Sequence, residues 1–358
     1  MTSNRPRVRD DLALREGYHS PQLDVEVRLN TNEAPAPPPQ AFTRQVMEAV
    51  EAVRWNRYPD RTASELRAAI GARYDRTAAE VFVANGSNEV LQTLLLAFGG
   101  PGRCAAVFEP TYALHSHIAR TTGTEVVEGR RRDDFSLDLD EVQRVIDEAD
   151  PDVVFLCSPN NPSGLVDPPH TVSEVLAMVE GRRTLLVMDE AYGQFAPTSA
   201  VGLIAEDVPL VVTRTFSKTW SMAAARLGYL LGPRWLVQEL ENVILPYHLD
   251  AMKQAAGLAA LGFSDDMNAR VAQVIEERGR LLEAFQDLPV TTWPSQASFF
   301  LFRPDDRDGN EVWQELVDRS ILLRNCASWP GLDGCLRVTI GTPEENDRLL
   351  DALRDILL

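Results

Sequence analysis

The sequence of 358 residues has no apolar run that approaches the length of about 18 residues needed to cross a membrane. Its first residues, Met1 to Arg7, also lack the apolar stretch of a secretion signal. Cysteine is scarce as well, since there are four cysteines and none forms a CxxC pair. We therefore expect no membrane partner, no disulfide framework and a reducing, cytoplasmic location.

Positive charge is also in short supply. The formal net charge is −18 and the isoelectric point is about 4.7. Because a protein that binds nucleic acid needs a basic face, we expect no nucleic-acid partner. The sequence also contains no GxSxG elbow, no Walker loop and no GxGxxG motif, so the reactions that these motifs support are disfavoured.

Two smaller motifs suggest a metal site and a basic patch, but each has a simpler interpretation. His115 and His117 form an HxH pair, but in a helix these two positions point apart and no third ligand lies nearby. We therefore expect no metal site. The run Arg130-Arg-Arg132 is followed by two aspartates and is expected to be a solvated turn.

Short apolar runs alternate with helical patterns from residue 81 to residue 231, which is typical of an α/β fold. Because these runs are apolar throughout, we expect a mostly parallel sheet covered by helices on both faces. The expected strands are Val81–Ala84, Cys104–Phe108, Glu125–Val127, Val153–Leu156, Leu185–Met188, Leu210–Val212 and Leu227–Leu231.

The segment before the sheet contains a polar, proline-rich stretch that favours an extended arm. A helix is expected over Gln40–Val53. The capping-box pattern from Thr62 to Glu65 predicts the start of a second helix, which runs to Tyr74.

After residue 246 the pattern becomes that of a smaller α+β unit. We therefore predict an N-terminal arm at residues 1–38, a large domain at 39–245, and a small C-terminal domain at 246–358 that includes part of the arm. The helices expected in the small domain are Leu249–Phe263, Val271–Phe285, Gly309–Arg319 and Pro343–Leu357, and its strands are Ser298–Phe302, Ile321–Arg324 and Leu336–Ile340.

Polar residues follow five of the expected strands, and ligands of α/β sheets bind beyond the carboxyl ends of strands. Lys218 follows one strand, and a desolvated lysine can form a Schiff base with a carbonyl compound. Arg226 lies two turns of helix further on, where it could point back at a phosphate. The other strand ends carry Gly86-Ser-Asn88, Tyr112, Asn160-Asn161 and Asp189.

These parts suit pyridoxal phosphate. The lysine can hold it, an acid can pair with its pyridine nitrogen, and an aromatic side chain can stack on its ring. A helix N-terminus together with an arginine can take its phosphate.

Four motifs also carry a resemblance to a known family. Asn161-Pro-Ser-Gly164, Asp189-Glu-Ala-Tyr192, Ser217-Lys218 with Arg226 downstream, and Leu336-Arg-Val-Thr-Ile-Gly341 resemble the motifs of class II aminotransferases. The resemblance extends over nearly the whole chain and is strongest to the histidinol-phosphate aminotransferases. It implies a fold-type I transferase that depends on pyridoxal phosphate, and a homodimer whose subunits share their active sites.

The resemblance also implies a role for each matching residue. Lys218 would form the Schiff base and shuttle the substrate proton. Asp189 would pair with the pyridine nitrogen, Asn161 and Tyr192 would contact the phenolic oxygen, and Tyr112 would stack on the ring. The cofactor phosphate would be surrounded by Gly86, Ser87, Asn88, Thr215, Ser217, Arg226 and, from the neighbouring subunit, Tyr58. Substrate contacts would come from Tyr18, Asn161, Arg324 and Arg337.

The implied reaction moves an amino group from histidinol phosphate to the 2-oxo acid 2-oxoglutarate in histidine biosynthesis, with ping-pong kinetics. The arm departs from the family pattern, because Tyr18-His-Ser-Pro21 stands where Tyr-x-Pro-Gly is usual. An aromatic amino-acid aminotransferase and a phosphothreonine-type decarboxylase therefore stay open as alternatives. A cofactor-binding regulator without activity is the third alternative, although we expect no room for a DNA-binding domain before Tyr18.

Overall fold

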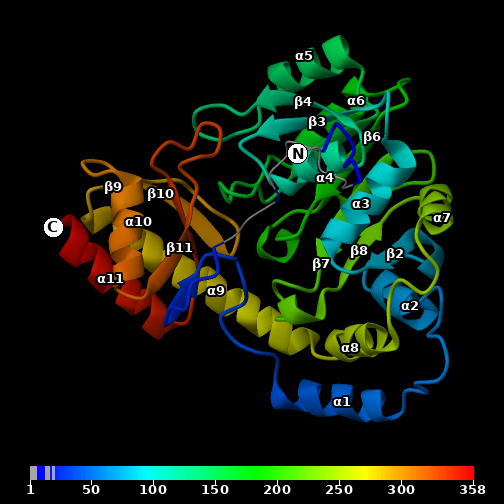
Figure 1. Cartoon of the computed structure of the whole chain (residues 1–358), viewed down its shortest axis with the longest axis horizontal. Helices are drawn as coiled ribbons and strands as arrows, with labels where there is room; N and C mark the ends of the chain where they lie inside the picture. Colours follow the sequence, from blue (N-terminus) through cyan, green and yellow to red (C-terminus); the bar gives the residue numbers. More distant parts are fainter. Residues whose placement is uncertain (1–5, 13–16, 18–20) are drawn as a thin grey trace.

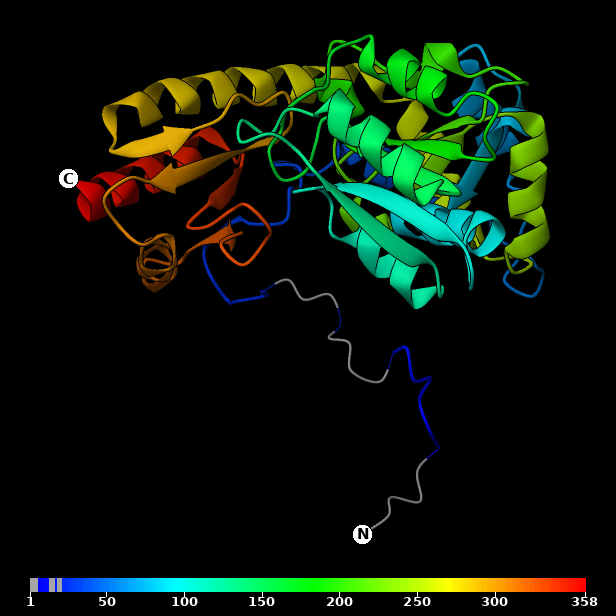
Figure 2. The same cartoon turned by 90° about the horizontal axis from the view of Figure 1, so that it is seen from above.

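The computed structural model describes residues 6–12, 17 and 21–358. It shows two lobes, a larger one around a seven-stranded sheet and a smaller one around a five-stranded sheet (Figure 1). The long helix α9 (Ser264–Ala284) runs from one lobe to the other, as Figure 2 shows from above. The pocket described below lies between these lobes.

The large sheet is mostly parallel, as predicted. Only β8, among the described strands of this sheet, runs against its neighbours β7 and β2. The strands follow one another across the sheet in the order β2 (Val81–Ala84), β8 (Gly228–Leu231), β7 (Leu210–Thr215), β6 (Leu185–Asp189), β5 (Val153–Cys157), β3 (Cys104–Glu109) and β4 (Glu125–Arg130).

Helices cover both faces of this sheet because its strands are apolar on both faces. One face packs against α3 (Ser87–Phe98), α4 (Leu114–Thr121) and α7 (Arg234–Val243). The other face packs against α2 (Ser64–Ala72), α5 (Leu139–Ala149), α6 (Thr171–Met178) and α8 (Ala251–Leu261), and α1 (Gln40–Glu51) lies against α8. The predicted α/β class is confirmed.

The small lobe combines the two ends of the described chain. Its sheet has the order β1 (Val27–Leu29), β11 (Ile321–Asn325), β12 (Leu336–Thr339), β10 (Phe299–Pro304) and β9 (Val290–Thr292). Helices α9, α10 (Gly309–Asp318) and α11 (Pro343–Leu357) complete the lobe (Figure 1). Its core includes Phe285, which meets Phe300 and Phe302 edge-to-face at 5.0 and 5.2 Å between ring centroids.

Several local predictions differ from the structure. The capping box of Thr62 and Glu65 is wrong, because α2 begins at Ser64 and its amide donates to Asp60 Oδ2 at 2.7 Å. Hydrogen bonding to Ser64 lowers the pKa of Asp60 to about 2. Three elements had no sequence prediction, namely β1, α7 and β9. Single turns of 3₁₀ helix occur at Ala78–Glu80, Gly193–Phe195, Ala200–Leu203, Ala223–Ala225 and Phe285–Asp287.

The division into an arm (1–38), a large domain (39–245) and a small domain (246–358) stays a proposal. Helix α8 packs against α1 and α2 and shares a core with the large sheet, whereas the later part of α9 packs in the small lobe. Within the described ranges, no helix combines the length and the apolar character needed to cross a membrane.

Candidate active site

A pocket between the lobes gathers most of the predicted site residues. It lies at the carboxyl ends of the large-sheet strands, where the α/β topology favours ligand binding. The N-terminal segment and the small lobe close its other sides. It is lined by Asn30, Thr31, Asn32, Ser87, Asn88, Tyr112, Cys157, Asn161, Asp189, Ala191, Tyr192, Thr215, Ser217, Lys218, Arg226, Arg324 and Arg337.

Lys218 lies just after β7, and its amine points into this pocket. Its Nζ donates to the backbone oxygen of Thr31 at 2.9 Å and lies 5.7 Å from the ring centroid of Tyr192. Desolvation, with the positive charges of Arg337 and Arg226, lowers the pKa of Lys218 to about 7. A substantial fraction of this amine is therefore neutral near neutral pH, which is the form that attacks a carbonyl group.

Asp189 ends β6 and is supported from behind by His115. The two side chains share a hydrogen bond of 3.0 Å between His115 Nε2 and Asp189 Oδ2, and both are buried. The imidazole stacks on the ring of Phe155, with 4.9 Å between ring centroids. It lies nearly perpendicular to the ring of Tyr112, with 5.4 Å between centroids. Sequence reasoning considered His115 only as a metal ligand, whereas the structure places it as the partner that buried Asp189 requires.

The N-terminus of α3 forms one end of the pocket, together with Arg226. Gly86 precedes this helix with φ of +84°, and a Cβ there would lie 2.5 Å from Arg226 Nη2. Arg226 Nη1 donates to Ser217 Oγ at 3.0 Å. A helix N-terminus with an adjacent guanidinium is a binding site for an anion such as phosphate.

Arg226 reaches this position by a different path from the one predicted. The chain after Lys218 does not form two turns of helix. It contains a single 3₁₀ turn, Ala223–Ala225, and then Arg226 itself with φ of 50°. Gly228 then brings the chain close to α3, because a Cβ there would lie 2.2 Å from the amide nitrogen of Ser87.

Two buried arginines form the small-lobe side of the pocket. Arg324 and Arg337 are directly opposite each other across β11 and β12, with 7% and 5% of their surface exposed. Arg337 donates to Asn161 Oδ1 at 2.5 Å and to the backbone oxygen of Asn30 at 2.8 Å. Its Nε is buried and has no hydrogen-bond partner among the described residues.

Cationic side chains outnumber carboxylates among the described residues that line the pocket. Among the described residues that line it, Asp189 is the only carboxylate, whereas the cations are Lys218, Arg226, Arg324 and Arg337. Like charges opposite each other on a sheet are unfavourable, so the arginine pair favours an anionic ligand. This excess of positive charge contrasts with the net charge of −18 for the whole chain.

Tyr192 is held by the N-terminal segment. Asn32 Nδ2 donates to the Tyr192 hydroxyl at 2.8 Å, and Thr339 Oγ1 donates to Asn32 Oδ1 at 3.0 Å. Burial raises the pKa of Tyr192, so its hydroxyl keeps its proton. Sequence reasoning gave no role to Asn30, Thr31 and Asn32; the available signal was a polar Asn-Thr-Asn run beside the departures in the arm.

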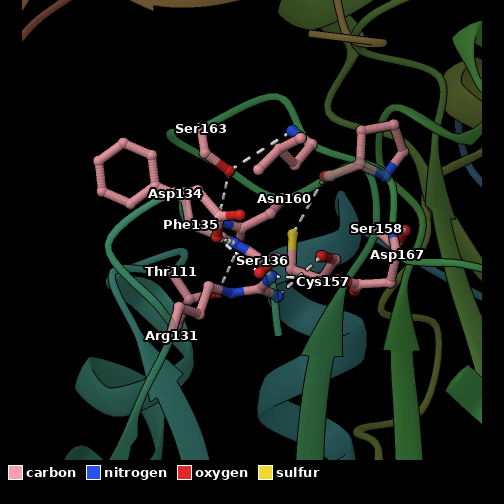
Figure 3. Close-up of polar contacts among 12 residues, drawn as sticks. Thr111, Arg131, Asp134, Phe135, Ser136, Cys157, Ser158, Asn160, Ser163 and Asp167 are labelled. Atoms are coloured by element: carbon pink, nitrogen blue, oxygen red, sulfur yellow. Dashed lines mark hydrogen bonds and ion pairs between the residues drawn. The ribbon is translucent and has the colours of Figure 1, made fainter. Parts of the chain in front are cut away.

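Polar contacts within the protein fix the loop that follows β5 (Figure 3). Asn160 is fully buried; it donates to Ser163 Oγ at 2.9 Å and accepts from Thr111 Oγ1 at 3.0 Å. Of the two predicted carboxamides, only Asn161 therefore lines the pocket. Asn160 holds the loop that presents it.

Arg131 contributes to the same network, so the prediction of a solvated turn was wrong for this residue. It is buried, and its Nη1 lies 3.1 Å from Asp167 Oδ1 and 3.2 Å from the backbone oxygen of Phe135 (Figure 3). A buried ion pair between residues 36 positions apart cannot be recognised from the neighbouring aspartates in the sequence.

One predicted residue lies away from the pocket. Tyr58 is 79% exposed and stacks on Tyr247, with 4.4 Å between ring centroids. Tyr18 falls outside the described residues. The remaining predicted residues are brought together: Tyr112 donates to Asn88 Oδ1 at 3.2 Å, and Thr215 lines the pocket beside Ser217.

The sequence profile of the family "Aminotransferase class I and II" matches residues 25–353. The chain belongs to this family. The predicted family and enzyme class are thereby confirmed: the chain is a pyridoxal-phosphate-dependent aminotransferase that uses an amino donor and a 2-oxo acid.

Curated relatives of this aminotransferase agree closely along its length. It is 45% identical to the histidinol-phosphate aminotransferase of Mycobacterium sp. (strain JLS), over 96% of this chain and 92% of that one. It is 44% identical to the histidinol-phosphate aminotransferase of Streptomyces avermitilis, over 98% of this chain and 96% of that one.

Among solved structures, the fold matches the histidinol-phosphate aminotransferase of Clostridium acetobutylicum with a TM-score of 0.85, at 22% identity, over 92% of this chain and 99% of that one. It also matches the Sinorhizobium meliloti histidinol-phosphate aminotransferase in complex with pyridoxal 5′-phosphate, with a TM-score of 0.83, at 22% identity, over 93% and 92% of the two chains.

The residues of the pocket fit the cofactor. The amine of Lys218 has a lowered pKa, the carboxylate of Asp189 is held by a buried histidine, and Gly86 leaves space for a guanidinium at a helix N-terminus. Each of these features matches a different part of pyridoxal phosphate, namely its aldehyde, its ring nitrogen and its phosphate.

Proposed function

We propose that this aminotransferase moves the amino group of histidinol phosphate to 2-oxoglutarate, the reaction named for its curated relatives. The observation that carries the proposal is the pair of buried arginines, Arg324 and Arg337, in a pocket whose described lining residues include one carboxylate. A phosphate monoester bears a charge of about −1.5 to −2 at neutral pH, which matches two guanidinium groups. An aromatic amino acid carries a single carboxylate, which offers fewer acceptor oxygens and less charge to the arginine pair.

We assign the residues that hold the cofactor from their positions in the pocket. Lys218 would hold its aldehyde carbon, Asp189 would pair with the ring nitrogen, and Tyr112 would lie against the ring. Asn161 and Tyr192 would contact the phenolic oxygen. The phosphate would lie among Gly86, Ser87, Asn88, Thr215, Ser217 and Arg226.

When bound, pyridoxal phosphate supplies an electron sink for the reaction. The protein supplies the proton transfers and the orientation. Once displaced by the donor amine, Lys218 Nζ can take the proton from the donor carbon that bears the nitrogen, because its lowered pKa matches neutral pH. His115 keeps Asp189 in place, and the arginine pair fixes the anionic group of the substrate.

Two substrates with different anions must use the same pocket in turn. Histidinol phosphate has one phosphate and no carboxylate, whereas glutamate has two carboxylates. The neighbouring guanidinium groups of Arg324 and Arg337 can together hold one phosphate or separately hold two carboxylates. This arrangement supports ping-pong exchange through a single site.

We also propose a homodimer in the cytoplasm. Trp55, Tyr58, Leu245 and Tyr247 are large apolar or aromatic side chains with 69%, 79%, 76% and 40% of their surface exposed. Such side chains favour burial against a second copy, which would bring Tyr58 toward the neighbouring site. Sedimentation of the purified protein tests the dimer, and a monomer would contradict it.

The proposed cytoplasmic location is supported by the cysteines. All four are free thiols, which fits a reducing compartment.

The test of function follows the visible absorption of the bound cofactor. We expect histidinol phosphate alone to bleach the band and to release one oxo product per site, and 2-oxoglutarate to restore it. Steady-state turnover of histidinol phosphate should exceed that of phenylalanine at least tenfold in kcat/KM. Faster turnover of phenylalanine would favour the aromatic aminotransferase, and a band unchanged by either donor would contradict an aminotransferase.

A further inference from the structure

Each of the two arginines of the pocket lies beside an aromatic ring. Arg337 is fixed by hydrogen bonds to Asn161 and Asn30, and its guanidinium lies 5.1 Å from the ring centroid of Phe299. The guanidinium of Arg324 lies 5.4 Å from the ring centroid of Trp329. Trp329 does not line the pocket, so it can affect the substrate only through Arg324.

Trp329 lies in the loop that connects β11 and β12. The loop is closed at its base by a bond from the Cys326 amide to the Cys335 oxygen at 3.0 Å. Within it, the Trp329 amide donates to the Cys326 oxygen at 2.9 Å, and the Leu332 amide donates to the Trp329 oxygen at 3.1 Å. These bonds give the indole a defined position beside Arg324.

The indole also packs on an apolar cluster that joins the two lobes. The cluster contains Leu301 and Leu332 of the small lobe and Phe135 of the large lobe, with Leu165 of the large lobe against its edge. Trp293 extends it and lies 5.0 Å from the ring of Phe135. The position of Trp329 therefore depends on contacts from both lobes. Because Arg324 lies against the indole, the position of its guanidinium depends on the same contacts.

We infer that Trp329 is a positioning residue that makes the arginine pair specific for a phosphate-bearing substrate. The inference rests on the proposed function. Without the indole face, the long side chain of Arg324 has more freedom, and its repulsion from Arg337 favours positions away from its neighbour. Arg324 then holds the anion less firmly, which weakens the binding of a phosphate more than that of a single carboxylate.

The experiment compares Trp329→Leu with the parent enzyme, using histidinol phosphate and histidinol as donors. Histidinol lacks the phosphate, so the arginine pair has nothing to hold. We expect KM for histidinol phosphate to rise by about two- to thirty-fold, with kcat changed less than about twofold. The kcat/KM ratio of histidinol phosphate to histidinol should fall by the same factor, and inorganic phosphate should inhibit less strongly.

Two further variants separate positioning from general stability. Trp329→Phe keeps an aromatic face and should recover most of the specificity ratio. Trp235→Leu removes a half-exposed tryptophan of the large lobe that donates to the Glu206 backbone oxygen at 3.1 Å, and it should leave the ratio unchanged. Thermal unfolding of each variant shows whether the fold is retained.

The outcomes are distinct. An unchanged ratio and unchanged phosphate inhibition in folded Trp329→Leu overturn the inference. An equal loss with both donors also overturns it, because that pattern indicates a structural role only. If the parent enzyme does not use histidinol phosphate, the proposed function fails, and the inhibition constant of inorganic phosphate still tests the link between Trp329 and the arginine pair.

Discussion

The two walls of the pocket balance their charges differently. On the large-lobe wall, formed by Tyr112, Asp189, Ser217, Lys218 and Arg226, the acid is paired with His115 and Arg226 bonds to Ser217. On the small-lobe wall, formed by Arg324 and Arg337, the two arginines are directly opposite each other across β11 and β12. Among the described lining residues, the large-lobe wall therefore combines an acid with cations, whereas the small-lobe wall places two cations side by side.

The largest loss of activity should come from replacing Lys218 in the large-lobe wall. The sequence contains two lysines, Lys218 and Lys253, and the second pairs with Asp250 at the start of α8. We expect Lys218→Met to reduce transamination by about 10²- to 10⁴-fold, because it removes the general base. Lys253→Met is the matched control and should stay active.

Covalent attachment of the cofactor also distinguishes Lys218 from Lys253. Borohydride reduction of the parent protein with its cofactor should attach the cofactor to Lys218, which peptide mass spectrometry can locate. Attachment at Lys253 would contradict the assignment of Lys218.

A smaller effect is expected from the small-lobe wall. Arg337→Leu removes charge-assisted hydrogen bonds to the substrate anion, which contribute about 1.5–3 kcal/mol, so KM for histidinol phosphate should rise about 10- to 150-fold. Affinity for the cofactor, measured by absorption titration, should change little. Arg348→Leu, which removes a half-exposed partner of Glu26, is the control. If Arg337→Leu instead loses affinity for the cofactor, the division into a cofactor-binding wall and a substrate-binding wall is wrong.

The smallest effect that we predict is a shift in the pH dependence of cofactor attachment, caused by a substitution in the small-lobe wall. The pKa of Lys218 is lowered to about 7 by desolvation and then by Arg337, so in the cofactor-free protein the amine loses its proton as pH rises through about 7. Cofactor attachment should therefore become faster between about pH 6 and pH 8. Arg337→Leu removes a positive charge that disfavours protonation, so the midpoint should move to higher pH. Stopped-flow absorption measures both profiles, and a shift to lower pH would oppose this cause.

The large-lobe wall was largely predictable from sequence. Each strand is a short apolar run, so the residue that follows it can be placed at one edge of a parallel sheet. Asp189 and Lys218 were located in this way, and Asn161 likewise lines the pocket. The roles assigned to these residues stay predictions until they are tested.

The remaining features depend on tertiary contacts that periodicity does not reveal. His115 was considered only as a metal ligand, because HxH spacing in a helix does not reveal the acid on the facing strand. Arg131 is adjacent to acids in the chain, yet its partner is Asp167. Asn32 reaches Tyr192 across 160 positions. In each case the partner is set by the fold and not by neighbours in sequence.

The pairing of β1 with β11 has a consequence for synthesis of the protein. Val27 lies beside Ile321, so the segment that contributes Thr31 and Asn32 to the pocket is anchored by a strand made almost three hundred residues later. At about 5–20 residues per second, the ribosome needs roughly 15–60 s to make the intervening chain. The large sheet can form during this interval, but the pocket cannot be completed. A nascent or truncated chain that ends before β11 is therefore expected to lack a finished active site, however well its first lobe has folded.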